Sequence, residues 1–414
     1  MVSTTPTTRN VATLAVIVAA LGYFVDIYDL ILFGMVRGPS LKDLGVAPGD
    51  LVDEGATLLS MQMYGMLLGG IFWGVLGDKR GRLSVLFGSI TLYSLANIAN
   101  GLCGTLDQYA ICRLIAGFGL AGELGAGITL VSELMDKDKR GVGTTLVAAI
   151  GVAGGVLAGL IGGAFDVPHP TWRVAYYIGG GLGLALLVLR IGVAESGMFH
   201  TAVAKKTVAR GNFFALFASR QRLVRYVAII FVGIPIWYCI GVAFTFADAI
   251  GKDMGMSPAP TGVTALFFCY AGTSLGALIS GALCQITESR KKTMAIHMAS
   301  VVVVITALYT VGGSSTTLFY ALCLAGGAAT GYWAVFVATA AELFGTNLRA
   351  TATTTAPNFV RGSLAGVLAV FKALTPGMGI LWAAVAVGVG TMVLAVIGLV
   401  LLPETYGVDL DYVE

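Results

Sequence analysis

Charged side chains are scarce in this sequence. Asp, Glu, Lys and Arg together make up 11% of the 414 residues, whereas soluble domains carry about 25%. Hydrophobic residues make up 57%, and the mean hydropathy is +0.87. The net charge of +3 is too small to indicate a nucleic-acid partner. This composition excludes an ordinary soluble domain and predicts a protein embedded in a lipid bilayer.

Ligands for metal ions are scarce as well. The chain has three histidines and six cysteines, with no CxxC pair. We therefore expect small buried thiols, no metal site and no organic cofactor. No nucleophile–base set is evident either, so the sequence does not predict an enzyme. The cysteines all fall in or at the ends of apolar segments: Cys103, Cys112, Cys239, Cys269, Cys284 and Cys323.

Long apolar runs, in contrast, recur along the whole chain. Runs of about 20 residues are long enough to cross a bilayer, and the longest polar interruption, 195–222, predicts a cytoplasmic linker. We expect an all-α membrane protein with an N-terminal six-helix bundle (1–194) and a C-terminal six-helix bundle (223–414). The runs predict twelve transmembrane helices, at 11–36, 55–77, 83–104, 107–135, 141–165, 172–194, 223–249, 259–287, 293–312, 316–343, 350–373 and 378–402.

The positions of lysine and arginine predict the orientation. Most of them lie before the first predicted helix or in the loops that would share its side of the membrane. Cytoplasmic loops carry the excess of positive charge in membrane proteins. We therefore expect a multi-pass protein of the cell (plasma or inner) membrane, with both termini in the cytoplasm and a functional monomer.

The two halves of the chain repeat each other. The stretch "SELMDKDKRGVGTT", which contains Glu133 and Arg140, aligns with "AELFGTNLRATATT", which contains Glu342 and Arg349. Both pairs are separated by 342 − 133 = 209 residues, about half the chain. Such a period predicts two bundles related by an axis along the membrane normal, with a central cavity between them.

A sequence motif follows the second predicted helix. "GVLGDKRGRLSVL", beginning at Gly74, resembles the major facilitator superfamily signature G-x-L-a-D-r-x-G-r-x-x-x-l. The resemblance implies that this loop is a conformational latch between helix ends; a solvated positive loop is the alternative interpretation. The resemblance to the superfamily covers the whole chain. Together with the repeat, it predicts these latch residues: Gly74, Asp78, Gly81, Arg82, Glu133, Arg140, Glu342 and Arg349.

Two further stretches resemble particular groups within this superfamily. "DIYDLILFG", in the first predicted helix, is similar to motifs of both the metabolite:proton symporters and the aromatic-acid:proton symporters. "RLIAGFGLAGE", in the fourth, resembles the first group, with Ala121 in place of a glycine. Both groups carry organic acids, and the sequence does not choose between them.

Acidic residues inside these apolar helices predict proton coupling. Asp26 and Asp29 are three residues apart and share a helix face. Arg113 is predicted to lie at the depth of Asp29 and to pair with it, which leaves Asp26, with Glu123, without a basic partner. A desolvated carboxylate without a partner binds a proton readily. A static bridge between Asp29 and Arg113 is the alternative.

The second half offers a positive charge in place of the acids. Arg361 is predicted near the middle of the membrane, where its planar guanidinium suits a carboxylate substrate; a bridge to an acid within the membrane is the alternative. Asn358 shares its helix face. Five aromatic residues are predicted to line the cavity, although packing would also explain them: Tyr28, Trp237, Tyr238, Tyr332 and Trp333.

Together these features predict a proton-coupled secondary transporter that takes up a small organic anion by alternating access, with the proton as coupling ion and lipid as its surroundings. An exporter that exchanges a drug or metabolite for protons is the nearest alternative. Its fifth helix would carry Gly-Pro where this chain has Ala158 and Gly159. A metal-ion exporter or a sensor without transport activity are remoter alternatives.

Overall fold

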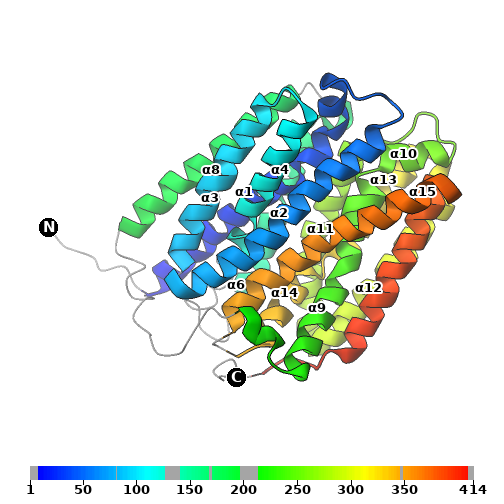
Figure 1. Ribbon diagram of the computed structural model, residues 1–414. Helices are drawn as coiled ribbons and strands as arrows, with labels where there is room; N and C mark the ends of the chain where they lie inside the picture. The colour runs from blue at the N-terminus through cyan, green and yellow to red at the C-terminus, as the bar shows by residue number, and fades with distance from the viewer. Residues whose placement is uncertain are drawn as a thin grey trace.

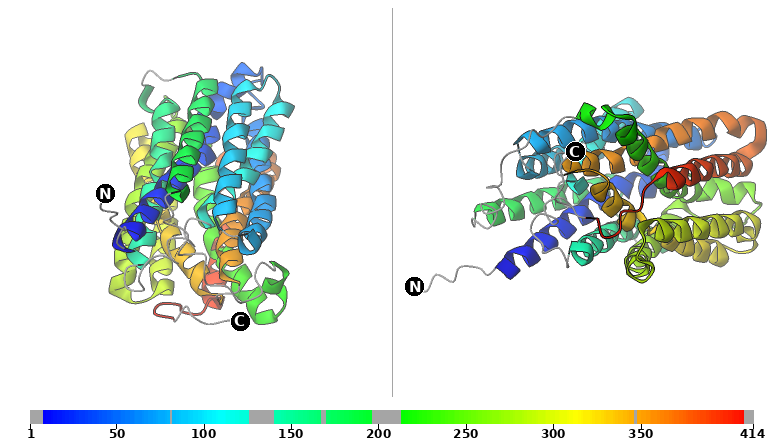
Figure 2. Two further views of the ribbon diagram at one scale, coloured as in Figure 1. Left: turned by 90° about the vertical axis from the view of Figure 1, so that its left-hand side faces the viewer. Right: turned by 90° about the horizontal axis from the view of Figure 1, so that it is seen from below.

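The computed structural model is built of α-helices that run side by side along one direction (Figures 1 and 2). No strand occurs in the residues that it describes. α1 begins and α15 ends at the same end of the bundle (Figure 1). The described residues are 8–80, 82–125, 140–166, 170–195, 213–345 and 348–408.

The first half of the described chain forms seven α-helices and one short 3₁₀ turn. These elements are α1 (Thr8–Asp43), α2 (Leu51–Arg80), α3 (Arg82–Leu102), α4 (Leu106–Leu120), α6 (Arg140–Val152), α7 (Gly154–Ile161), η2 (Ala164–Asp166) and α8 (Trp172–Glu195).

The second half contains longer helices and more interruptions. Its elements are η4 (Phe213–Phe217), α9 (Arg220–Tyr238), the π-helix η5 (Cys239–Phe244), α10 (Ala247–Asp253), α11 (Gly262–Thr287), α12 (Arg290–Thr310), η6 (Gly312–Ser314), α13 (Thr316–Thr330), α14 (Trp333–Glu342) and α15 (Arg349–Leu401).

Nine helices in the described residues are long and apolar enough to cross a membrane. One of them, Thr351–Leu401, has 51 residues, and its backbone leaves the helical region at Gly379 (φ 81°). Glycine adopts this conformation because it lacks a Cβ. The two pieces of α15 correspond to the eleventh and twelfth predicted segments. The count of twelve stays a prediction, since 126–139 lies outside the described residues.

Two helices break at positions that the repeat relates. α4 ends at Leu120 and is followed by a turn at Gly122, and α13 ends at Thr330 and is followed by a turn at Gly331. The two glycines are 331 − 122 = 209 residues apart, which is the predicted period. In the second half, α9 continues past Pro235 to Tyr238 and is followed directly by the π-helix η5.

The two halves of the chain meet at both ends of the bundle. At one end, Arg37 Nη2 lies 2.7 Å from Asp248 Oδ1, and Lys372 Nζ lies 2.7 Å from Asp53 Oδ1. Between the ends, α2 packs along α15 and α11 packs against α6 and α7 (Figure 1). At the other end, the backbone of Gly125 contacts Thr354 too closely to leave room for a Cβ. Side chains at the centre of the bundle, such as Asp26 and Arg361, are fully buried.

Close approach of helices depends on glycine, as is usual in membranes. A Cβ on Gly65 of α2 would collide with the carbonyl of Leu114 in α4, and a Cβ on Gly117 of α4 would collide with the carbonyl of Gln62. The two helices therefore touch backbone to backbone.

We expect Gly65→Ala to destabilise the protein by about 1–3 kcal/mol, because the added methyl group forces α2 and α4 apart. Gly366→Ala is the matched control: nothing lies within 4 Å of its added Cβ, so its stability should equal or slightly exceed that of wild type. Thermal unfolding in detergent measures both. Equal melting temperatures for the two variants would contradict the described α2–α4 contact.

Candidate functional site

Arg361 is fully buried at the centre of the bundle, on α15. Its guanidinium carbon lies 5.8 Å from the ring centre of Trp237 and 5.6 Å from that of Trp333. Its Nη2 is 3.7 Å from Asp26 Oδ2, but none of its three side-chain nitrogens has a hydrogen-bond partner among the described residues. Arg361 therefore has an ion-pair contact with an acid within the membrane, which was the alternative interpretation, while its N–H groups are left without hydrogen bonds that an anion could accept.

The two tryptophans are placed by interrupted helices. Trp237 is one residue from the end of α9, immediately before the π-helix, and Trp333 is the first residue of α14 after the turn at Gly331. Trp333 Nε1 donates to the hydroxyl of Tyr23 at 2.8 Å, while Trp237 Nε1 has no partner. We call the five residues that meet here the central cluster: Tyr23, Asp26, Trp237, Trp333 and Arg361.

Both aspartates of α1 are buried without hydrogen bonds. In the described part of the chain, no atom donates to either carboxylate oxygen of Asp26 or Asp29. Asp26 belongs to the central cluster. Asp29 packs against Gly179 of α8, where a Cβ would collide with it. The prediction that no basic residue lies at the level of Asp26 is wrong, because Arg361 reaches it from the other half.

Arg113 does not form the expected pair with Asp29. Its Nη2 instead donates to Gln62 Oε1, its Nη1 donates to the hydroxyl of Tyr176 at 3.4 Å, and its guanidinium lies 4.7 Å from the ring centre of Phe33. Phe33 is one helical turn beyond Asp29 on α1. Asp29 and Arg113 were predicted to pair because they lie at equal depth on their helices, but equal depth did not bring them into contact. Neutral oxygen atoms accept the hydrogen bonds of the Arg113 guanidinium instead.

Glu123 has a partner that the sequence analysis missed. Both of its oxygens accept hydrogen bonds from Arg190 of α8, one of them at 2.9 Å, and both residues are buried. Gly22 makes room for this pair, since a Cβ there would collide with both side chains. Arg190 stands alone in the apolar run "LLVLRIGV", and a lone arginine inside a predicted membrane helix was the available signal. Glu123 is therefore not a carboxylate without a basic partner.

The buried charges of the helix interiors balance. Within the described residues, three carboxylates and three guanidinium groups are buried away from the bundle ends. The only bidentate pair among them is that of Glu123 and Arg190. The six residues are Asp26, Asp29, Glu123, Arg113, Arg190 and Arg361.

Two of the predicted aromatic residues join helices. Tyr28 donates its hydroxyl hydrogen to the carbonyl of Ala175 at 2.9 Å, and Tyr332 donates to the carbonyl of Val232 at 2.9 Å. None of the described hydrogen bonds connects either hydroxyl to the central cluster. These hydrogen bonds agree with packing, the alternative interpretation, and a role of the two rings in substrate binding stays a prediction.

Tyr238 and Asn358 also differ from the prediction. The hydroxyl of Tyr238 meets that of Tyr309 at 2.8 Å, on the side of α9 away from Trp237. Asn358 donates to the carbonyls of Ala121 and Thr354 at 2.7 and 2.8 Å, so that it ties α15 to the end of α4. A shared helix face with Arg361 did not place Asn358 in the central cluster.

Only part of the predicted latch is described. Gly74 lies against Thr355 of α15, 3.3 Å from a Cβ placed on it. Glu342 accepts hydrogen bonds from Arg290 at 2.7 and 3.1 Å. Arg349 donates to the carbonyl of Ala341 at 3.0 Å. The side chains of the other latch residues lie outside the described ones: Asp78, Arg82, Glu133 and Arg140, together with the backbone of Gly81.

The chain after α15 joins this end of the second half. Glu404 accepts hydrogen bonds from the hydroxyl of Ser289 and from the backbone N–H of Arg290 at 2.9 Å. Burial alone would raise the pKa of Glu404, but the hydrogen bonds from Ser289 and from backbone N–H groups lower that pKa to about 2. The carboxylate therefore stays ionised and caps the start of α12.

No group of three potential metal ligands occurs in the described residues. The central cluster instead combines a guanidinium, two indole rings and one carboxylate. This chemistry suits an anion with an apolar body, and a proton.

Comparison with known proteins identifies the family. The profile of the Major Facilitator Superfamily matches residues 16–370. A 3-(3-hydroxy-phenyl)propionate transporter of Escherichia coli is 26% identical over 84% of this chain and 86% of its own. A protein of Cupriavidus pinatubonensis named a probable 4-methylmuconolactone transporter is 25% identical over 94% and 90%. A niacin transporter of Acinetobacter baylyi is 32% identical over 43% and 40%.

These relatives are named as transporters, and the family profile covers most of the chain. Both findings indicate a transport protein and not an enzyme. The protein is a multi-pass, all-helical membrane transporter that acts on a small molecule. It belongs to the major facilitator superfamily.

Proposed function

We propose that the protein is a proton-coupled symporter that takes up a small organic anion by alternating access. The observation that carries this proposal is Arg361, a fully buried guanidinium 3.7 Å from Asp26, whose three nitrogens have no hydrogen-bond partner in the part of the chain that the structure describes. A substrate carboxylate would supply two parallel hydrogen bonds to it. Uptake, the cell membrane, cytoplasmic termini and a functional monomer belong to the same proposal.

The substrate that suits this site carries a ring or a compact apolar body. The rings of Trp237 and Trp333 lie on Arg361 with their centres 6.5 Å apart. They would hold an aromatic or unsaturated body while Arg361 holds its carboxylate. Two relatives are named as transporters of 3-(3-hydroxy-phenyl)propionate and, as a probable one, of 4-methylmuconolactone. Both of these compounds contain a ring, which supports a substrate with a ring.

Charge balance supplies the reason for proton coupling. The described helix interiors hold three acids and three arginines, so a bound anion adds one uncompensated negative charge in a medium of low dielectric constant. Protonation of Asp26 would remove that charge. It would also release Arg361 from the carboxylate 3.7 Å away, so that the substrate takes the place of Asp26.

Alternating access requires that each end of the bundle opens in turn. The ion pairs Arg37–Asp248 and Lys372–Asp53 close one end, and the contact of Gly125 with Thr354 closes the other. The described conformation encloses the central cluster from both sides. It corresponds to the occluded step, in which transfer of charge between Asp26 and the substrate is shielded from water.

We expect Asp26→Asn to abolish uphill uptake driven by a pH gradient while exchange of labelled for unlabelled substrate continues. The amide imitates the protonated acid, and exchange needs no net proton movement. Vesicles with the reconstituted protein and an imposed pH gradient measure both activities. Asp50→Asn, which changes an exposed carboxylate, is the matched control and should behave as wild type.

Two outcomes of this experiment would count against the assignment. If Asp26→Asn still concentrates substrate in response to the gradient, Asp26 does not carry the coupled proton. If Asp29→Asn alone uncouples uptake from the gradient, the proton resides on Asp29.

For Arg361→Lys we expect at least tenfold weaker binding of an aromatic carboxylate, about 1.4 kcal/mol. Lysine retains the charge but cannot make two parallel hydrogen bonds. Titration of the purified protein with 3-(3-hydroxyphenyl)propionate and with benzoate measures the affinity. Arg173→Lys, at a half-exposed position near the bundle end, is the control. Unchanged affinity in Arg361→Lys would remove Arg361 from the substrate site.

A further inference from the structure

Three helices of the first half, α1, α3 and α8, meet along a row of buried polar side chains. Asp29 of α1 and three residues of α3 are fully buried there: Tyr93, Asn97 and Asn100. Their spacings of four and three residues place the α3 side chains on one face of that helix. We call these four residues the polar seam. α3 runs beside α8 (Figure 1), and Gly179 of α8 packs on Asp29.

Each member of the polar seam has a polar atom without a hydrogen bond. Among the described residues, nothing pairs with these atoms: both carboxylate oxygens of Asp29, the hydroxyl of Tyr93, Nδ2 of Asn97 and Oδ1 of Asn100. Nδ2 of Asn100 lies 3.5 Å from Oδ1 of Asn97, so the two amides are neighbours. Asn97 also interacts with the carboxylate of Asp29. Unpaired buried polar atoms are costly, and water is the partner that satisfies such groups in protein interiors.

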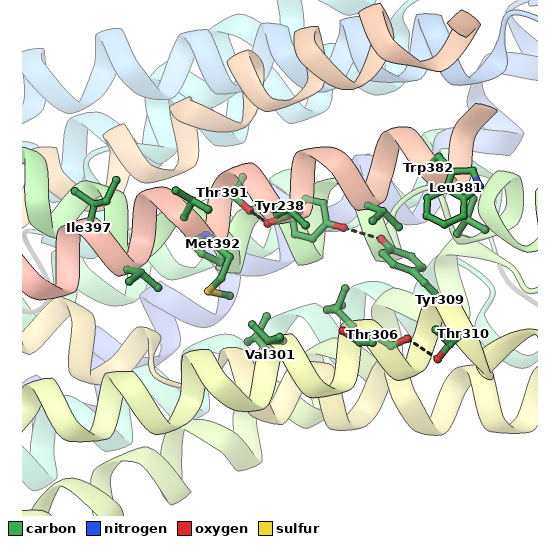
Figure 3. A pocket seen from close by; sticks show the side chains of 18 residues that line it. Tyr238, Val301, Thr306, Tyr309, Thr310, Leu381, Trp382, Thr391, Met392 and Ile397 are labelled. Atoms are coloured by element: carbon green, nitrogen blue, oxygen red, sulfur yellow. Dashed lines mark hydrogen bonds between the residues drawn. The ribbon is translucent and has the colours of Figure 1, made fainter. Parts of the chain in front are cut away.

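The second half contains a counterpart of this seam in which the polar atoms are paired. The repeat, with 238 − 29 = 209, relates these residues: Asp29 to Tyr238, Asn100 to Tyr309, and Gly179 to Gly388. A Cβ on Gly388 would collide with Tyr238, as one on Gly179 would with Asp29. The hydroxyls of Tyr238 and Tyr309 meet at 2.8 Å, as the dashed line in Figure 3 shows. The same packing therefore holds two paired phenols in one half and small, unpaired polar groups in the other.

One end of the polar seam lies close to water. Asn100 is two residues before the end of α3, about 3 Å along the helix. The carbonyl of the next residue, Gly101, accepts a hydrogen bond from Arg173 at 3.1 Å, and the Arg173 side chain is 34% exposed. Asn97, beside Asp29, is about 7.5 Å from this end, half the way to the middle of a bilayer core about 30 Å thick. The positive-inside rule predicts that this end of α3 faces away from the cytoplasm.

The other end of the polar seam approaches the remaining carboxylates of the first half. Tyr93 interacts electrostatically with Glu123, Asp29 and Asp26. The charged groups that act on Asp29 are Asp26 and Arg113. A hydroxyl group both donates and accepts a hydrogen bond. The Tyr93 hydroxyl, together with water, can therefore pass a proton from Asp29 to Asp26.

A bound substrate makes a separate route for the proton useful. In the proposed mechanism the anion lies against Arg361, 3.7 Å from Asp26, and takes the place of that carboxylate. The anion then fills the space between the two halves through which water would otherwise reach Asp26. α3 and α8 pack mainly against helices of the first half, so a path along the polar seam does not cross that space.

We propose that the polar seam is the path by which a proton from the outer surface reaches Asp29 and then Asp26, along water held by Asn97 and Asn100. Each transfer makes and breaks only O–H bonds: a hydronium ion outside loses a proton, and a carboxylate gains it. This inference rests on the proposed proton coupling. It adds a route for the proton that is distinct from the route of the substrate.

The path is tested with the full-length protein in vesicles that carry a pH gradient. Asn97→Leu removes the polar atoms of the amide at a similar side-chain size. Uptake of 3-(3-hydroxyphenyl)propionate driven by the gradient should be roughly tenfold slower, which corresponds to a barrier about 1.4 kcal/mol higher. Exchange of labelled for unlabelled substrate should keep its wild-type rate, because the bound proton travels with the substrate and none has to enter.

A second measurement needs no substrate. After a drop in pH, time-resolved infrared spectroscopy of the purified protein records the C=O bands of the buried carboxylic acids that form. In Asn97→Leu these bands should reach their wild-type height about ten times more slowly. Asp29→Asn, which removes an acid that receives the proton, should instead lower the height.

Two further variants serve as rescue and control. Asn97→Ser keeps a hydroxyl group and leaves space for water, so both rates should stay close to those of wild type. Thr91→Val is the matched control on the same helix, because the Thr91 hydroxyl donates to the carbonyl of Phe87 at 2.8 Å and lies outside the polar seam. Thr91→Val should behave as wild type, and melting temperatures verify that every variant is folded.

Three results would overturn the proposal. The first is wild-type uptake and wild-type band kinetics in Asn97→Leu, which would refute the path alone. The second is equal slowing of uptake and exchange, which would reduce Asn97 to a structural role. The third is a wild-type protein with neither gradient-driven uptake nor carboxylic acid bands, in which case the proton coupling fails together with the path.

Discussion

Balance of buried charge is the constraint on which this transporter depends. In the described helix interiors, three carboxylates and three guanidinium groups lie where a bilayer offers no water. Glu123 and Arg190 neutralise each other in a bidentate pair. Asp26 and Arg361 are close but do not share a hydrogen bond. In the proposed mechanism, a substrate anion and a proton enter together at that looser pair without changing the total charge.

Close helix packing buries the charged side chains, so their charges have to balance. The helices touch closely at glycines, as α2 and α4 do, and Asp26 and Arg361 are fully buried between them. Low dielectric surroundings strengthen every charge interaction there. Helix interruptions lie beside both tryptophans of the site: Trp333 begins α14 after the turn at Gly331, and the π-helix follows α9 directly after Tyr238.

Much of the fold and some of the site could be predicted from the sequence. The apolar runs, the period of 209 residues and the motif at Gly74 were enough for an all-helical transporter of this family, which the profile confirms. The importance of Asp26 and Arg361 also follows from charges within apolar runs. Their contact does not, because they lie in different halves, and helical rise gives depth but not which faces meet.

The errors have the same physical origin. Arg113 was assigned to Asp29 from depth alone, and the neutral oxygen of Gln62 holds it instead. Glu123 was left without a basic partner because Arg190 was overlooked inside an apolar run. Tyr238 and Asn358 share helix neighbourhoods with site residues but face other helices. Rotation about the helix axis, which sequence spacing gives only relative to neighbours, decided the cases of Arg113, Tyr238 and Asn358.

The most direct test of the charge-balance account is the number of protons taken up when the substrate binds. Purified protein in weakly buffered detergent solution at alkaline pH is mixed with the anion, and a pH indicator records the change. The account predicts uptake of about one proton per bound anion in wild type and none in Asp26→Asn. Binding of the anion to wild type without proton uptake would contradict it.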